Sequence, residues 1–245
     1  MVGPQPLELC ILVRIQASQQ KAEIRICMQG LGKGLKAVIF DFDDTLVGSV
    51  ESKWAQHKHV ARTFYDFELT DTELKLHWGK PFNEMVMLLY KTDNLEVATK
   101  NVYSCRLEYP KVLFKGSFEL LEKLHALGIK VGIITATSRY GFDQDLSQHN
   151  FPSHTISYTQ TSEDTSFHKP DPKVFEPTIA WLSSHDIAPN QAVYIGDGLR
   201  DMQAAIGSGL NFIGVETGMD SEDLKSSKVK TYPTIGHINS LVKAP

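Results

Sequence analysis

The chain has 245 residues, 42% of them hydrophobic, which suits one large domain or two small ones with a substantial core. Its formal net charge of −4 argues against a nucleic-acid scaffold. The three cysteines have neither disulfide-framework nor metal-ligand spacing, which favours idle thiols in a reducing compartment and therefore a cytoplasmic protein. No apolar run approaches the roughly 20 residues of a membrane-spanning helix, so we expect no membrane partner.

Residues 1–35 form an N-terminal extension with the weakest structural pattern. The apolar run at 9–13 is too short for a signal-peptide core and follows no basic segment. A transit peptide, a poorly ordered tail and an upstream-start artefact ahead of Met28 all stay open. The glycine-rich stretch 30–34 precedes a strand, whereas a phosphate loop follows one.

The first confident strand is predicted over 36–41, and a cluster of acids closes it. Asp41, Asp43 and Asp44 put three carboxylates within four positions. Two unit charges about 5 Å apart repel by roughly 3 kcal/mol at an effective dielectric near 20. Such a cluster indicates either a bound cation or chemistry that needs one of the acids.

Residues 52–109 carry several helical patterns with no strand between them. Phe82 begins an i, i+3, i+4, i+7 apolar stripe behind Pro81, and Thr70 with Glu73 forms a capping box that opens another helix. We therefore expect an all-helical domain over 50–114, inserted between the core segments 36–49 and 115–245.

The core segment after residue 115 alternates short apolar runs with helical patterns. Strands are predicted to end at Thr135 and to cover 154–158, 192–195 and 211–215. Helices are predicted over 120–127, 143–148, from Pro172 with a kink or later start at Pro177, around 202–206, and over 235–242. This alternation is typical of an α/β domain with a parallel sheet.

Polar residues that could act together stand at or near the ends of different strands. Thr135 closes one run, Asp197 follows another with Asp201 four residues later, and Lys169 lies between them in the chain. In open α/β sheets the ligand site lies beyond the carboxyl ends of the strands. The sequence therefore predicts that these side chains converge with the acids at 41–44.

Four segments resemble, in order, the four motifs of the haloacid dehalogenase-like hydrolase superfamily. They are Asp41-Phe42-Asp43-Asp44-Thr45, Thr135, Lys169-Pro170 and Gly196 to Asp201. The resemblance spans roughly residues 36–220, and the helical insertion resembles the cap of the phosphoglycolate phosphatase-like branch. It implies a Rossmann-like parallel sheet core with an inserted all-helical cap. It also implies a magnesium-dependent phosphatase for a small phosphorylated metabolite, such as phosphoglycolate or a sugar phosphate.

The resemblance also implies a role for each motif residue. Asp41 would be the nucleophile that forms an aspartyl-phosphate, and Asp43 the general acid and base. Thr135, the adjacent Ala136 and Lys169 would bind the phosphoryl group. Mg²⁺ would be held by Asp41, the backbone carbonyl of Asp43, Asp197 and Asp201. An acid at position 43 favours phosphoryl transfer over dehalogenation, because a halide leaving group needs no proton.

Several alternatives stay open at this point. A phosphomutase of the same fold, or a non-catalytic binding protein, could carry the same motifs. Asp44 could be a turn residue, and Asp201 could serve only to start a helix. In the cap, Lys80 could bind a substrate carboxylate or second phosphate, or be a solvated surface lysine. Other candidate cap residues are Trp54, His57, Gly79 and Phe82. The oligomeric state is not predicted.

Overall fold

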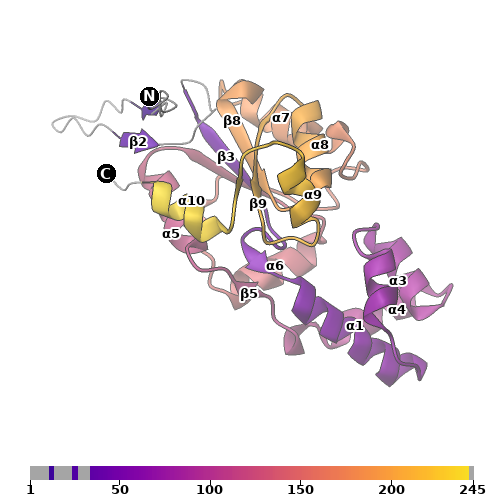
Figure 1. Cartoon of the computed structure of the whole chain (residues 1–245). Coiled ribbons are helices and arrows are strands. Elements are labelled where there is room, and N and C mark those ends of the chain that lie inside the picture. The colour runs from indigo at the N-terminus through magenta and orange to yellow at the C-terminus, as the bar shows by residue number, and fades with distance from the viewer. Residues whose placement is uncertain (1–10, 14–23, 27–33, 243–245) are drawn as a thin grey trace, which may run out of the picture. The chain divides into compact units, whose positions relative to one another are not determined.

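The protein is described by a computed structural model in which residues 11–13, 24–26 and 34–242 are placed. The chain divides into two compact units (Figure 1). The first, here called the core unit, comprises Met1–Leu46 and Phe114–Pro245, and the second, the inserted unit, is Val47–Leu113.

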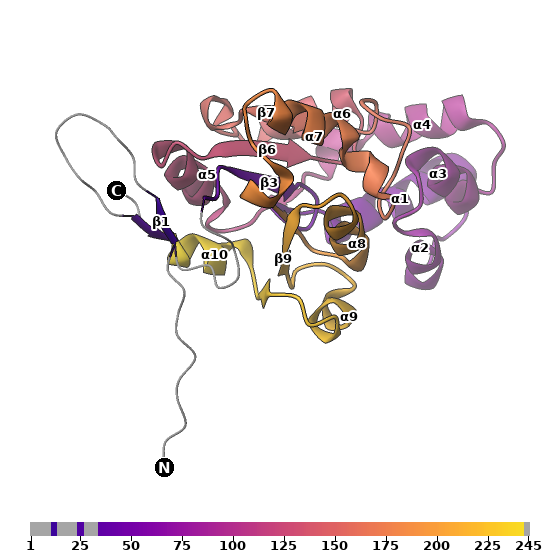
Figure 2. The same cartoon turned by 90° about the horizontal axis from the view of Figure 1, so that it is seen from above.

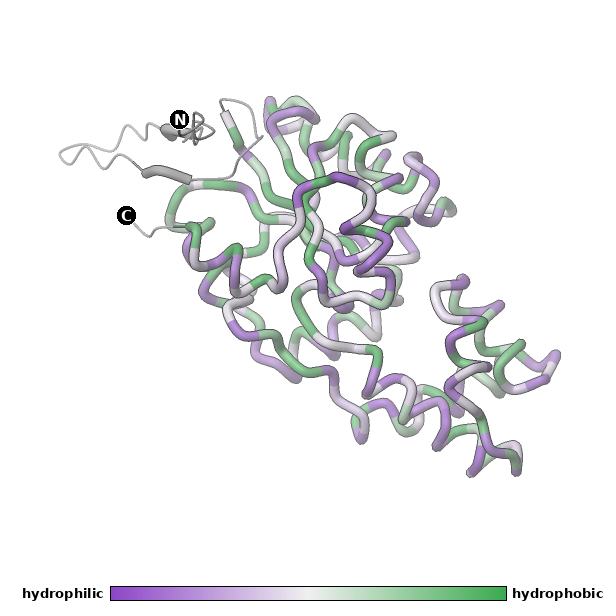
Figure 3. The backbone as a smooth tube through the Cα atoms, viewed as in Figure 1, coloured by the Kyte–Doolittle hydropathy of each residue, from purple (hydrophilic) through white to green (hydrophobic). Residues whose placement is uncertain are grey.

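A parallel sheet organises the core unit. In the described part of the chain its six strands have the order β10-β9-β8-β3-β6-β7 (Figure 2). Their bounds are Thr231–Tyr232 (β10), Asn211–Val215 (β9), Ala192–Gly196 (β8), Ala37–Asp41 (β3), Lys130–Ile134 (β6) and Tyr158–Gln160 (β7). All five residues of β3 are buried, and this central strand is mostly hydrophobic in Figure 3. Continuous apolar strands are expected where helices cover both faces of a sheet.

Helices cover the two faces of this sheet. Ala37, Ile39 and Tyr194 pack in one apolar cluster with residues of α7 (Glu176–Ser183), α8 (Leu199–Gly207) and the 3-10 turn Pro172–Phe175. The opposite face carries α5 (Ser117–Ala126) and α10 (Ile235–Leu241), which pack against each other (Figure 1). The core unit also contains α6 (Arg139–Gln148) and α9 (Ser221–Ser226).

The inserted unit is helical and has its own apolar core. Its helices are α1 (Val50–Tyr65), α2 (Asp71–His77), α3 (Phe82–Tyr90) and α4 (Leu95–Ser104). The predicted capping box is present, since Glu73 N donates to Thr70 Oγ1 at 3.2 Å and Thr70 N donates to Glu73 Oε2 at 3.0 Å. Hydrophobic and hydrophilic stretches alternate along these helices (Figure 3), as amphipathic packing requires.

The predicted all-helical insertion has a short strand at each of its ends. The strands β4 (Val47–Gly48) and β5 (Val112–Leu113) pair antiparallel where the chain enters and leaves the inserted unit. Two-residue strands carry too little alternation to be recognised from a sequence pattern.

Most of the N-terminal extension, residues 1–35, lies outside the described residues, as do the expectations made for it. Within it, β1 (Ile11–Val13) and β2 (Ile24–Ile26) pair antiparallel. Among the helices of the described ranges, none combines the length and apolarity that crossing a bilayer requires.

The strand predicted over 154–158 is wrong. Residues Ser153–Thr155 form a 3-10 turn in which the Thr155 hydroxyl donates to the carbonyl of Pro152 at 2.7 Å, and the strand begins only at Tyr158. A proline followed by a hydrogen-bonding threonine stabilises a local turn over an extended ladder.

Two helix starts also differ from the predicted positions. Helix α6 begins at Arg139, four residues before the predicted 143, because Ser138 Oγ accepts from the backbone of Gly141 at 3.2 Å and caps it. After Pro172 a 3-10 turn comes first, and α7 begins at Glu176 with Pro177 in its first turn, which confirms the later start.

Candidate active site

The site is assembled from the carboxyl ends of three neighbouring strands. Strand β3 lies between β6 and β8 and ends at Asp41. Thr135 directly follows β6, and Asp197 directly follows β8. Because the strands are parallel, their carboxyl ends share one edge of the sheet, so residues dozens of positions apart meet there.

Lys169 joins two carboxylates at this edge. Its Nζ lies 2.5 Å from Oδ1 of Asp41 and 2.6 Å from Oδ1 of Asp201. All three side chains are buried or nearly so, with 16% of Lys169 exposed and less than 10% of each aspartate. The backbone of Lys169 is also fixed, because the Arg200 guanidinium donates two hydrogen bonds to its carbonyl, at 3.1 and 2.7 Å. Charge-assisted contacts of this length in a buried setting fix both carboxylates.

Asp197 completes a cluster of three acids. One carboxylate oxygen from each of Asp41, Asp197 and Asp201 lies within 4.8 Å of the others. The Thr45 hydroxyl donates to Asp197 Oδ1 at 3.4 Å, and the backbone of Gly198 donates to Asp201 Oδ2 at 3.1 Å. The Lys169 ammonium pairs with the buried Asp41 and Asp201, while Asp197 is half-buried beside them. Hard divalent cations prefer carboxylate oxygens. The donor set therefore fits Mg²⁺.

Two threonines hold the Asp43 carboxylate. The hydroxyls of Thr137 and Thr135 donate to Asp43 Oδ2 at 3.1 and 3.4 Å, and Thr135 Oγ1 in turn accepts from the backbone of Thr137 at 3.0 Å. Asp44 next to it has φ 56°, a left-handed turn conformation, and its carbonyl accepts a hydrogen bond from the Thr217 hydroxyl. A turn role for Asp44 is thus present in the structure.

Electrostatics favours the neutral forms of Asp41 and Asp197 and the charged form of Lys169. Burial, above all, raises the pKa of Asp41 to about 7, with Lys169 opposing the rise and Asp201 adding to it. Burial and the nearby charges of Asp201 and Asp41 likewise raise the pKa of Asp197 well above its usual range. Burial disfavours the Lys169 ammonium, yet the carboxylates of Asp201 and Asp41 outweigh it and raise the pKa of Lys169. Perturbation of this kind is typical of functional sites.

The remaining candidate residues lie as follows. Ala136 is exposed in the bend after Thr135. In the inserted unit, Lys80 is exposed and its Nζ pairs with Oε1 of Glu84 at 2.5 Å. His57 is buried there, its Nδ1 2.5 Å from the Tyr90 hydroxyl, so it is a core residue of the inserted unit.

Several residues at the site carry no recognisable sequence signal. Thr137 stands near Thr135 in the sequence but matches no motif position. Tyr194 lies in an apolar strand, where a tyrosine is usually a packing residue, yet its hydroxyl reaches Asp41 and Asp201. Gly218 follows the last long strand, and only its tertiary contact with Asp197 makes it part of the site.

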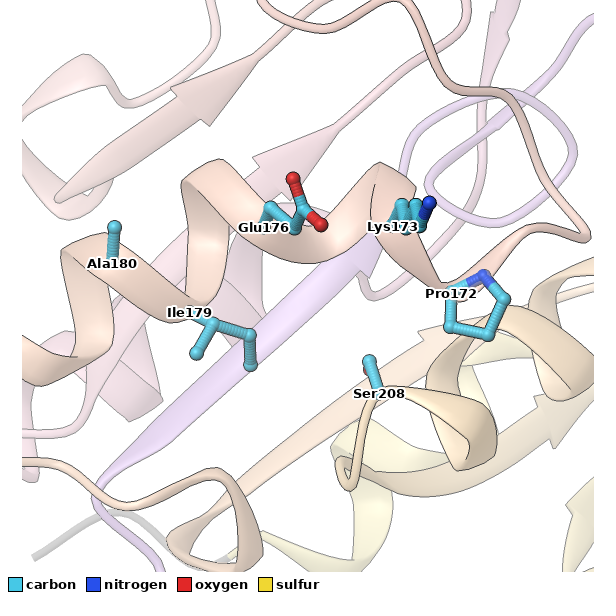
Figure 4. A pocket seen from close by; sticks show the side chains of 6 residues that line it. All are labelled: Pro172, Lys173, Glu176, Ile179, Ala180 and Ser208. Atoms are coloured by element: carbon cyan, nitrogen blue, oxygen red, sulfur yellow. The ribbon is translucent and has the colours of Figure 1, made fainter.

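A separate surface hollow of about 430 Å³ lies elsewhere on the core unit (Figure 4). It is lined by Pro172, Lys173, Glu176, Ile179, Ala180 and Ser208. None of the clustered acids lines it. The candidate site is therefore the acid cluster, not this hollow.

A parallel α/β sheet with a helical insertion after its first long strand, and an acid–lysine cluster at the strand ends, defines a class of hydrolases. The model of the haloacid dehalogenase-like hydrolases matches residues 38–215. The chain belongs to this family, as the motifs predicted.

The relatives bear phosphatase names. A Clostridium perfringens protein assigned as pyrophosphatase PpaX is 26% identical over 202 residues, covering 81% of this chain and 92% of that protein. The validoxylamine A 7'-phosphate phosphatase of Streptomyces hygroscopicus subsp. limoneus is 26% identical over 206 residues, covering 79% and 92%. A solved structure described as a haloacid dehalogenase-like hydrolase from Bacteroides fragilis is 26% identical, with a TM-score of 0.69 and coverage of 83% and 99%. This chain is an enzyme, a hydrolase in the phosphatase branch of the superfamily.

Proposed function

We propose that this protein is a cytoplasmic, magnesium-dependent phosphatase that hydrolyses a small phosphomonoester through an aspartyl-phosphate on Asp41. One observation carries the proposal: Lys169 bridges the Asp41 and Asp201 carboxylates, with Asp197 within 4.8 Å, at the ends of neighbouring strands. The substrate is a phosphoglycolate-like or sugar-phosphate-like metabolite. The validoxylamine phosphate named for one relative is a phosphorylated small molecule of this kind.

In the first half of the reaction, Asp41 attacks phosphorus in line and displaces the alcohol. A P–O bond forms to the aspartate as the bond to the leaving oxygen breaks, which splits one difficult displacement into two easier ones. Lys169, held as an ammonium, offsets the negative charge shared by the nucleophile and the phosphoryl oxygens.

Asp43 moves the protons. In its acid form it protonates the leaving oxygen, and as a carboxylate it then takes a proton from the water that attacks the aspartyl-phosphate. This work contributes roughly 10²–10⁴-fold. The hydroxyls of Thr135 and Thr137 orient the Asp43 carboxylate for both steps.

Asp41, Asp197 and Asp201 would hold Mg²⁺, together with the backbone carbonyl of Asp43. When bound, the cation supplies charge compensation for the phosphoryl group and for the clustered acids. Thr135, Ala136 and Lys169 are the proposed phosphate-binding residues, and Lys80 a proposed contact to the rest of the substrate.

The test is a panel of phosphomonoesters assayed for phosphate release with Mg²⁺ and with a chelator. The variant Asp41→Asn should lose at least about 10³-fold in kcat, while Asp186→Asn, at an exposed left-handed turn position that asparagine tolerates, should match the wild type. Rapid acid quench with labelled substrate should leave hydroxylamine-sensitive label on the wild type and none on Asp41→Asn.

Other outcomes would overturn the proposal. Full activity of Asp41→Asn would exclude Asp41 as the nucleophile. Isomerised sugar phosphate without phosphate release would indicate a phosphomutase. A protein that binds neither Mg²⁺ nor orthovanadate would be a non-catalytic member of the family.

A further inference from the structure

Tyr194 combines an apolar ring environment with a polar hydroxyl environment. The residue lies in the middle of β8 and is fully buried. Its ring meets Phe175 edge-on at a centroid distance of 4.8 Å and lies 6.4 Å from the ring of Phe212. A phenylalanine would satisfy all of these ring contacts, so packing alone does not explain the hydroxyl.

The hydroxyl instead reaches two acids of the site. It lies 3.3 Å from Oδ1 of Asp41 and 3.2 Å from Oδ1 of Asp201. These are the same two oxygens that Lys169 Nζ contacts at 2.5 and 2.6 Å. A hydroxyl has one proton and donates to one acceptor at a time, whereas the ammonium has three protons and can serve both. The tyrosine therefore adds one donor to oxygens the lysine already binds.

This arrangement leaves the two oxygens of Asp41 in different environments. Among the described residues, the recorded contacts of its carboxylate with Lys169 and Tyr194 both end on Oδ1. Rotation of an aspartate carboxylate about χ2 is soft and roughly two-fold, so a single contact fixes it poorly. Lys169 and the Tyr194 hydroxyl, which donates in turn to Asp41 or Asp201, reach Oδ1 from two separate segments of the chain. Together they restrict this rotation and leave Oδ2 as the oxygen that can attack.

We propose that Tyr194 is a positioning residue that fixes the carboxylate plane of Asp41 so that Oδ2 points at phosphorus. The inference rests on the proposed function, because it assumes that Asp41 is the nucleophile. Near-attack alignment is sensitive, and a misplacement of about 1 Å can cost on the order of 10²-fold in rate. A hydroxyl that served only stability would instead affect unfolding and leave turnover of the folded enzyme unchanged.

The experiment compares Tyr194→Phe with Tyr158→Phe. The second variant also removes one hydroxyl from a strand of the same sheet. The Tyr158 hydroxyl donates to Gln160 Oε1 at 3.0 Å and to none of the clustered acids. Measured are kcat, KM, the melting temperature and the affinity for beryllofluoride, a mimic of the phosphoryl group on a carboxylate. Tyr194→Phe should lower kcat about 10–100-fold and weaken beryllofluoride binding, with KM within about twofold. Tyr158→Phe should leave kcat and beryllofluoride binding unchanged.

Three results would overturn the inference: kcat of Tyr194→Phe within twofold of the wild type, a loss found only in KM, or a variant that does not fold. Asp41→Asn, assayed beside it, separates this inference from the proposed function. An inactive Asp41→Asn with a normal Tyr194→Phe leaves the nucleophile in place and rejects only the positioning role. An active Asp41→Asn rejects the proposed function itself.

Discussion

The Cβ atom that Gly218 lacks would lie 2.0 Å from Oδ2 of Asp197 and 2.8 Å from the backbone oxygen of the same residue. Both distances are shorter than real Cβ contacts. The adjacent Thr217 donates its hydroxyl to the carbonyl of Asp44. The segment that follows β9 thus packs directly on two of the loops that carry the acids, and position 218 admits no side chain unless Asp197 or the backbone around 218 moves.

Gly218→Ala should weaken metal binding more than it weakens the fold. Either the Asp197 carboxylate or the 217–219 backbone must shift, so we expect at least about a 10-fold rise in the Mg²⁺ concentration for half-maximal activity. This concentration is measured by titrating the activity with Mg²⁺, and the Mg²⁺ affinity is measured directly by isothermal titration calorimetry. The control is Gly198→Ala, whose added Cβ would meet Asp201 at 3.5 Å, an ordinary contact. Equal effects of the two variants would contradict the steric argument.

Lys169→Met should lower both activity and stability. Removing the ammonium leaves Asp41 and Asp201 facing each other in a buried setting, and breaking a buried pair typically costs about 3–5 kcal/mol. We expect a stability loss of that order in urea unfolding and a kcat loss of at least about 10³-fold. Adding Asp201→Asn to Lys169→Met should restore part of the stability and none of the activity. A double variant as unstable as the single one would indicate that charge repulsion is not the cause.

Asp43→Asn should produce a loss that depends on the leaving group. An alkoxide leaving group needs a proton, so kcat on an alkyl phosphate should fall roughly 10²–10⁴-fold. Nitrophenolate leaves without one, so the first step on nitrophenyl phosphate should be much less affected. Single-turnover rates on both substrates make the comparison. The same loss in the first step on both substrates would exclude Asp43 as the acid.

His57 should make the inserted unit less stable in acid. Burial, with help from the Lys53 charge, lowers the pKa of His57 to about 3, and its ring packs near Trp78 and bonds the Tyr90 hydroxyl. The unfolded chain takes up a proton near pH 6.5 that the folded chain does not. Stability is therefore unaffected by this group above pH 6.5 and falls as the pH drops toward 3. Between pH 6.5 and 5 the loss should be about 1.6 kcal/mol.

Because carboxylates also titrate in this range, the effect of His57 is measured as the difference in the pH dependence of stability between His57→Gln and its parent. Unfolding is followed by the fluorescence of Trp54 and Trp78 in a Trp181→Phe background. His57→Gln should show a shallower fall in stability from pH 6.5 to 5 than its parent, whereas His59→Gln, at a half-buried position of the same helix, should follow the parent. Parallel pH profiles for His57→Gln and its parent would mean that His57 is not kept neutral by the fold.

The sequence determined the family, the order of the long core elements and the ordered set of acids, threonine and lysine. It could do so because apolar periodicity and capping chemistry are local, and the motif residues stand next to strands that the pattern reveals. Strand β9 occupies the predicted 211–215. Short elements such as β10 and α9, and the displaced strand β7, depend on pairing partners and local turns that leave weak patterns.

Only the tertiary structure decided what surrounds those residues. That the Tyr194 hydroxyl serves two acids, that Thr137 shares Asp43 with Thr135, and that Gly218 must lack a Cβ all follow from parallel strands bringing distant segments to one edge. The physical reason is that side-chain hydrogen bonding and steric exclusion act over a few ångströms in space, whereas sequence patterns report only neighbours along the chain.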